Sequence, residues 1–308
     1  MPYLSFLVCC IVWGGSFILM DRAALAFGPL DIAIGRMALG ALVVAAYCQL
    51  TGRWIKITGR DYVHLVIVSF FANVWPYVVQ PCVMRQAGEH AFFGMFMAFV
   101  PLTTIIASIP MLGALPTPRQ LVGVLGGLAC MMMVMWDGSH RGIPLMLLAL
   151  SVSVPISYAV GNTYIKWKLD HLSAAPLTAV FLAIGALMLV PLRLAPAAVN
   201  LLRLEPPTSP HDAPLAFGAL LILGVGGTGL CILLFVQMVK TRGPLFAGMV
   251  TYIIPLVALL WGQVDHERLS ALQVGAMAGV LAMVALVQWR PVRPIDVVEM
   301  TPTAEPPA

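Results

Sequence analysis

One apolar stretch occurs twice in the chain, and this repeat constrains the fold more than any other feature of the sequence. Residues 91–104 read AFFGMFMAFVPLTT and residues 245–258 read LFAGMVTYIIPLVA, with Pro101 and Pro255 at equivalent places. The offset is 255 − 101 = 154 residues in a chain of 308 residues, so each copy belongs to one half. A duplicated apolar helix with a central proline is typical of transporters built from internal repeats.

The composition places nearly the whole chain in a membrane. Hydrophobic residues make up 60% and charged residues 10%, whereas soluble domains carry about 25% charged residues. A helix needs about 20 apolar residues to cross a bilayer, which leaves no room for a soluble domain. The apolar runs that meet this length are 3–20, 30–50, 62–82, 89–113, 118–136, 143–165, 174–194, 214–237, 243–262 and 269–289.

We therefore expect an all-α integral membrane protein with ten transmembrane helices, arranged as two inverted five-helix repeats. Residues 1–137 form the first repeat and residues 138–289 the second. Because five is an odd number, the second copy crosses the membrane in the opposite sense to the first. The proline-rich segment 290–308 is predicted to be a disordered cytoplasmic tail.

Charge in the loops predicts the orientation. If the N-terminus is cytoplasmic, ten Lys and Arg residues fall on the inner side against six outside, so both termini are expected in the cytoplasm. Topology thus accounts for the net charge of +4, and we expect no nucleic-acid partner. Six cysteines without paired spacing indicate neither disulfides nor a metal site. The expected partners are the lipid bilayer and a small-molecule substrate, with no cofactor, and the sequence is compatible with a monomer.

Polar and aromatic side chains inside the apolar runs indicate where a substrate binds. Asn73 and Tyr77 are four residues apart in run 62–82, with Trp75 between them. They share one helix face, which must contact protein or water rather than lipid. The predicted substrate-binding set consists of Trp13, Ser16, Asn73, Trp75, Tyr77, Met97, Pro101, Ser157, Tyr158, Thr228, Thr251, Tyr252 and Pro255.

Arg36 lies about seven residues into run 30–50, at a depth where a charge is costly unless it is paired or reaches the interface. One interpretation is a structural anchor or an ion pair with Asp21, Asp31 or Glu89. The other is that Arg36 is the charge partner of a substrate carboxylate. The sequence leaves both open.

The pattern resembles an EamA-type transporter of the drug/metabolite transporter superfamily. The resemblance rests on Trp13-Gly14-Gly15-Ser16-Phe17 in the first helix, on Arg36 after Pro29, and on the central prolines of helices 4 and 9. It implies an exporter of amino acids or related metabolites in a bacterial inner membrane. It also implies a central cavity lined by helices 1, 3, 4, 6, 8 and 9.

These features together predict secondary transport of a small metabolite by alternating access, and no enzyme activity. No Asp or Glu lies at the middle of an apolar run and no P-loop occurs, so a carboxylate proton relay has no candidate and ATP-driven transport has no support. Facilitated efflux, exchange and proton antiport remain open. The alternatives are a nucleotide-sugar, sugar-phosphate or drug carrier of the same superfamily, a membrane-embedded lipid-modifying enzyme, and a structural membrane subunit.

Overall fold

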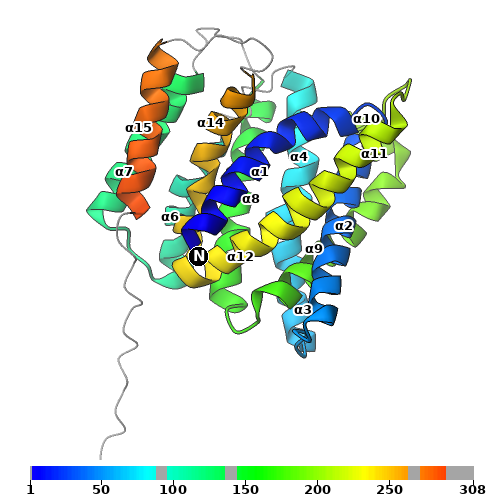
Figure 1. The fold of residues 1–308 in the computed structure, drawn as a ribbon, viewed down its shortest axis with the longest axis horizontal. Helices are drawn as coiled ribbons and strands as arrows, with labels where there is room; N and C mark the ends of the chain where they lie inside the picture. Colours follow the sequence, from blue (N-terminus) through cyan, green and yellow to red (C-terminus); the bar gives the residue numbers. More distant parts are fainter. Residues whose placement is uncertain (1, 88–95, 136–143, 263–270, 289–308) are drawn as a thin grey trace, which may run out of the picture.

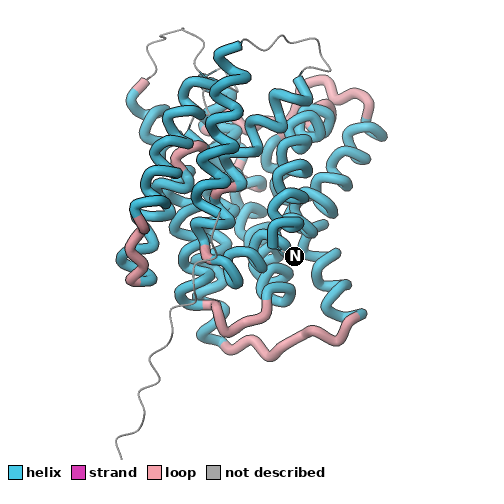
Figure 2. Tube along the Cα trace, turned by 60° about the vertical axis from the view of Figure 1, so that its left-hand side comes forward, coloured by secondary structure: helices cyan, strands magenta, loops and turns pink. Residues whose placement is uncertain are grey.

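The computed structural model describes residues 2–87, 96–135, 144–262 and 271–288 (Figure 1). Within these ranges all regular structure is helical (Figure 2). The elements are α1 (Pro2–Ala23), α2 (Pro29–Leu50), α3 (Gly59–Ser69), η1 (Phe70–Val74), α4 (Trp75–Ala87), α6 (Val100–Leu112), α7 (Pro118–Met135), α8 (Leu145–Lys168), α9 (Ala174–Arg193), α10 (Pro196–Leu201), α11 (Ala213–Ile222), η2 (Leu223–Leu230), α12 (Cys231–Arg242), α13 (Pro244–Gly248), α14 (Val250–Gly262) and α15 (Ala271–Gln288).

The prediction of an all-helical membrane protein is confirmed for the described residues, and each predicted apolar run contains helix. Within the described residues, six helical stretches are long and apolar enough to cross a membrane, and shorter apolar helices accompany them. The number of ten crossings stays a prediction. The six stretches are Pro2–Ala23, Pro29–Leu50, Gly59–Val83, Leu145–Lys168, Ala174–Arg193 and Ala213–Arg242.

Helix contacts that involve equivalent helices of the two halves occur in matching pairs. Helix α2 packs along α9, and α7 packs along α15 at one edge of the molecule (Figure 1). Helix α1 contacts α11, η2 and α12, as α8 contacts α3, η1 and α4. Helix α14 lies against α1, as α6 lies against α8. Exchanging the halves converts each of these pairings into itself or into another one on the same list.

Two π-helical segments interrupt the long helices at corresponding places. η1 begins at Phe70 and η2 at Leu223, an offset of 223 − 70 = 153 residues. Pro76 follows η1 and has no N–H to donate to the carbonyl four residues earlier, which favours a wider turn there. In η1 the Trp75 N–H instead bonds the Phe70 carbonyl five residues back. Such π segments are often found at functional sites.

Glycines allow helix backbones from the two halves to approach closely. A Cβ atom at Gly161 of α8 would lie 2.8 Å from the Ala72 nitrogen in η1. A Cβ atom at Gly40 of α2 would lie 3.0 Å from the Gly229 nitrogen in η2. The nearest atoms at both crossings are backbone atoms, which cannot rotate away; a side chain at Gly161 would force the helices apart, and one at Gly40 would have very little room.

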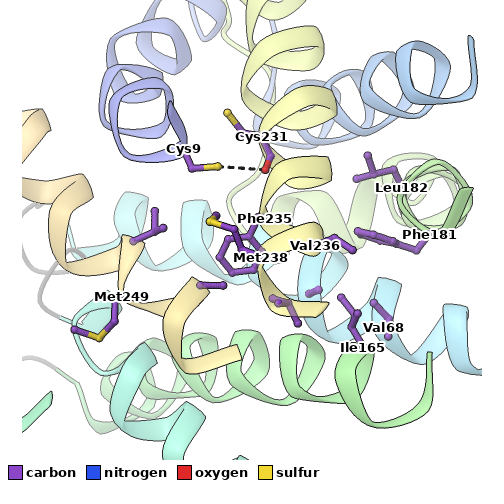
Figure 3. Packing of buried hydrophobic residues seen from close by; sticks show 14 of the residues in the cluster. Cys9, Val68, Ile165, Phe181, Leu182, Cys231, Phe235, Val236, Met238 and Met249 are labelled. Atoms are coloured by element: carbon purple, nitrogen blue, oxygen red, sulfur yellow. Dashed lines mark hydrogen bonds between the residues drawn. The ribbon is translucent and has the colours of Figure 1, made fainter. Parts of the chain in front are cut away.

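A buried apolar core joins the first helix to the second half (Figure 3). The Cys9 thiol donates a hydrogen bond of 3.4 Å to the Cys231 carbonyl, next to Phe235 and Met238 of α12. On the other side of α12, Val236 lies in the same cluster as side chains of α3, α8 and α9. Helix α12 is therefore enclosed by helices of both halves.

Charged side chains connect helix ends at one face of the molecule, which we call the basic face and define by Lys166, Asp170, Lys240 and Arg242. The Lys240 ammonium donates to the carbonyls of Leu169 and Asp170 and lies 3.4 Å from the Asp170 carboxylate. Lys166 donates to the Lys240 carbonyl and to Asp170. These bonds fix the carboxyl ends of α8 and α12 to each other.

The same face holds the amino end of α1. Arg242 lies over the Tyr3 ring, 5.5 Å from its centroid, and the Tyr3 hydroxyl donates to the Gln288 carbonyl of α15. The carboxyl end of α8 and the amino end of α1 thus lie at one side of the molecule.

Candidate functional site

Four helical elements meet around the Arg36 side chain of α2, which is half-buried. Its Nε donates a hydrogen bond of 3.1 Å to the Thr228 hydroxyl in η2. Its guanidinium carbon lies 4.9 Å from the centroid of the Tyr77 ring in α4, at a distance where a cation interacts with the ring face. One terminal nitrogen contacts the Met20 sulfur of α1 at 3.6 Å. Elements of both halves of the chain therefore hold this one cation.

The three carboxylates expected to pair with Arg36 do not do so in the described part of the chain. Asp31 pairs instead with Arg193 of α9. Asp21 is exposed and Glu89 lies outside the described residues. Among the described residues no Asp or Glu oxygen lies within 4 Å of the Arg36 guanidinium. The partners that the described residues offer to this positive charge are all neutral.

Aromatic side chains lie beside the Arg36 cluster. The Trp75 indole donates a hydrogen bond of 2.9 Å to the Ser153 hydroxyl of α8. Trp75, Met97 and Tyr158 pack against the same small apolar cluster. Tyr158 is within electrostatic range of both the Tyr77 hydroxyl and Arg36. The structure thus brings Arg36, Tyr77, Tyr158 and Thr228 together, and Trp75 is connected to them through the apolar cluster that it shares with Tyr158.

Two predicted site residues bind backbone carbonyls of the π segments. The Trp13 indole of α1 donates a hydrogen bond of 2.7 Å to the Gly227 carbonyl in η2. The Ser157 hydroxyl of α8 donates one of 2.7 Å to the Phe71 carbonyl in η1. Each bond runs from the first helix of one half to the π segment of the other half.

Asn73 lies in η1 and is 2% exposed. Its side-chain Nδ2 has no hydrogen-bond partner among the described residues. The side chain is near Gly185 of α9, because a Cβ atom there would lie 3.8 Å from the Asn73 Cβ. An unsatisfied buried amide costs about 1–3 kcal/mol. Asn73 therefore places an unpaired hydrogen-bond donor in the interior, at the α9 interface.

Other predicted residues lie apart from this region or bind their own helix. Tyr252 is fully buried, and its hydroxyl donates a hydrogen bond of 2.7 Å to the Val124 carbonyl of α7. The ring packs where a Cβ atom on Gly127 would sit 2.5 Å away. Ser16 donates to the Val12 carbonyl and Thr251 to the Gly248 carbonyl, each one turn back. Tyr252 in this structure is a packing residue between α14 and α7.

The two repeated prolines occupy different helical positions. Pro101 is buried in the first turn of α6, which starts after a turn at residues 98–99. Pro255 lies inside α14, after a break between α13 and α14 at Met249. Both apolar runs are therefore interrupted near their prolines, although α14 continues through Pro255.

Met20 and Ser153 contact the site but are absent from the predicted set. Met20 is seven residues after Trp13, and Ser153 is four residues before Ser157. Both spacings put a side chain on the same helix face as a predicted residue. Helical periodicity was thus a sufficient signal for both.

A groove of about 250 Å³ between α2 and α9 has a different character. Its lining includes Ala41, Trp54, Ala179 and Leu187 and is almost entirely apolar. It is suited to acyl chains or apolar side chains rather than to a polar metabolite. We therefore separate it from the Arg36 region.

Comparison with known proteins gives a family and a fold. The model of the EamA-like transporter family matches residues 1–136 and 144–289. Among the solved structures 27 chains match. One, titled "Crystal structure of protein", has a TM-score of 0.75 at 16% sequence identity and covers 95% of this chain and 98% of its own. At that identity the likeness concerns the fold alone. No curated protein matches the chain.

Proposed function

The chain belongs to the EamA-like transporter family, and from that membership we propose that it is a secondary transporter of small metabolites such as amino acids. It exports them by alternating access through a site between the two halves. The observation that carries this proposal is the cluster around Arg36, to which α2 and α4 contribute from one half and η2 from the other. A site held by both halves changes its exposure when the halves move relative to each other.

We further propose that residues 1–137 and 138–289 are inverted five-helix repeats with ten crossings in total. The exchangeable helix pairings and the offset of 153 residues between η1 and η2 support this assignment. The amino end of α1 and the carboxyl end of α8 both lie at the basic face, which supports opposite directions for the first helices of the halves. The positive-inside rule favours a cytoplasmic basic face, and we propose a bacterial inner-membrane location from the family membership.

Facilitated efflux or exchange fits these residues best, because no described acidic residue lies in the middle of a membrane-spanning helix. The described acidic residues Asp61 and Asp170 lie at helix ends, and Asp31 pairs with Arg193. Facilitated efflux or exchange requires no proton relay, whereas proton antiport requires a titrating group. A sugar-phosphate carrier is the second candidate, but a dianionic phosphate normally needs several cations, and Arg36 is a single one.

Flux through the purified full-length protein in proteoliposomes tests the proposed function. Radiolabelled amino acids are followed in both directions, with and without a pH gradient, for wild type, Asn73→Ala and Tyr77→Ala. Tyr47→Ala is the control, since Tyr47 also lies under an arginine, Arg53, but on the exposed surface of α2. We expect saturable flux that the first two substitutions reduce at least tenfold and the control preserves. Absence of flux for every amino acid would remove this substrate class.

A further inference from the structure

We propose that Arg36 forms a carboxylate-binding subsite, and that the substrate is a small organic acid whose single carboxylate is joined to an apolar or aromatic body. The inference rests on the proposed transport function and narrows its substrate class. The required group is the carboxylate, whereas an amino group is not required.

The first step concerns charge. An arginine inside a membrane span is energetically costly, and such residues usually pair with an acidic group or face water. Arg36 has only neutral described partners, namely the Thr228 hydroxyl, the Met20 thioether and the Tyr77 ring. A bound anion would supply a negative charge that none of these described partners carries.

The second step concerns geometry. A guanidinium carries five N–H donors, and the bonds seen here use Nε and one terminal nitrogen, the latter on a weak sulfur acceptor. Thr228 holds the Nε side while Tyr77 lies against the guanidinium face. The edge formed by the two terminal nitrogens keeps donors for a carboxylate, which binds such an edge with two parallel hydrogen bonds. The arginine is therefore oriented before a ligand arrives.

The third step concerns the size of the ligand's charge. The other described Lys and Arg residues lie in loops or near helix ends, such as Arg22 at the end of α1 and Arg193 at the end of α9. Arg193 is already paired with Asp31. One cation matches one carboxylate, whereas a phosphate carries about −1.5 to −2 at neutral pH.

The fourth step concerns the rest of the ligand. Tyr77 and Tyr158 are half-buried near Arg36 and offer apolar ring surface, and Trp75 packs in the same apolar cluster as Tyr158. No described acidic residue forms an ion pair with Arg36, so a substrate ammonium bound here would meet the Tyr77 ring rather than a carboxylate paired with Arg36. We therefore expect a deaminated acid to bind at least as tightly as the matching amino acid.

Three probes with the same phenyl body test the subsite. The purified full-length protein in detergent is titrated calorimetrically with 3-phenylpropionate, phenylalanine and phenethylamine, which carry the carboxylate alone, both groups, and the amine alone. We expect 3-phenylpropionate and phenylalanine to bind and phenethylamine to bind at least tenfold more weakly. Equal binding of the amine, or no binding of either carboxylate probe, would overturn the proposal.

Variants connect the preference to Arg36. Arg36→Gln should weaken 3-phenylpropionate binding about 10- to 100-fold, the range of a lost charged hydrogen-bond pair, and Arg36→Lys should retain part of it. Thr228→Val, which removes only the Nε acceptor, gives a milder test if Arg36→Gln does not fold. Arg53→Gln is the matched control, because Arg53 also lies over a tyrosine ring, at 5.4 Å, on the surface. Unchanged binding of the acid in Arg36→Gln would refute the assignment.

Flux measurements on the same variants separate this proposal from the proposed function. Arg36-dependent binding without flux in proteoliposomes would retain the subsite and remove transport. Flux of phenethylamine that is insensitive to Arg36→Gln would retain transport and remove the subsite.

Discussion

The Trp13 indole donates a 2.7 Å hydrogen bond to the carbonyl of Gly227, a residue of the π segment η2. Ser157 makes the corresponding bond to the Phe71 carbonyl in η1. In both cases the first helix of one half satisfies a carbonyl of a π turn in the other half. The halves are thus joined at the places where their long helices depart from α-helical geometry, next to the Arg36 cluster.

Replacing either donor should destabilise the protein. Trp13→Phe and Ser157→Ala each leave one π-segment carbonyl without its donor, at a cost of about 0.5–2 kcal/mol. We expect a similar decrease in thermal unfolding temperature for both variants, measured in detergent. Ser151→Ala is the control, since Ser151 is buried on the same helix but donates to the Leu147 carbonyl one turn back. A larger loss in the control than in Ser157→Ala would argue against the special role of the π segments.

The crossing of α8 over η1 should tolerate no side chain at Gly161. A methyl group there meets Ala72 backbone atoms at 2.8 and 3.1 Å, so Gly161→Ala must separate the two helices. We expect strong destabilisation and reduced flux. Gly218→Ala is the matched control in α11, because no atom lies within 4 Å of its Cβ position, and this change should be neutral or slightly stabilising. Equal stability of the two variants would contradict the packing described here.

Lys240 should hold the carboxyl ends of α8 and α12 together at the basic face. Its side chain is 12% exposed. The ammonium donates to the backbone carbonyls of Leu169 and Asp170 and lies near the Asp170 carboxylate. Lys240→Met leaves the carboxyl end of α8 without these donors, so amide hydrogen exchange in the α8–α9 turn should increase. Lys168→Met, which removes a cation over the Trp167 ring, serves as the control. Unchanged exchange in Lys240→Met would show that other contacts hold this face.

Tyr252 provides a test of packing against substrate binding. Tyr252→Phe removes the hydroxyl that donates to Val124 and leaves the ring in place. We expect a lower unfolding temperature with an unchanged KM for flux, because the side chain faces α7. An increased KM with unchanged stability would instead support the substrate-binding role that the sequence predicts for Tyr252.

The positions of the helices follow closely from the sequence because a bilayer demands long apolar runs. An interruption of the helix close to Pro76, where η1 lies, also follows from the sequence, since Pro76 lacks a backbone donor. The π segment η2 was not, because the run from Leu223 to Leu230 is rich in glycine and glycine specifies no single turn.

The site was predictable by residue type more than by partner. Tyr77 and Thr228 are polar groups in apolar runs, which predicts a place in the site, and both contact Arg36 in the structure. Periodicity identifies the face of a helix but not which distant helix meets it. For this reason the sequence does not indicate that Asp31 pairs with Arg193, or that the Tyr252 hydroxyl donates to the Val124 carbonyl of α7.

Accessibility of position 77 from the two membrane faces tests alternating access most directly. A single cysteine replaces Tyr77 in a background whose native cysteines are changed to alanine and which still transports. Membrane-impermeant maleimide is then applied to right-side-out and inside-out vesicles. Our account predicts labelling from both faces without ion conductance, and a shift between faces when substrate is added. Labelling from one face only, whatever the substrate, would contradict it.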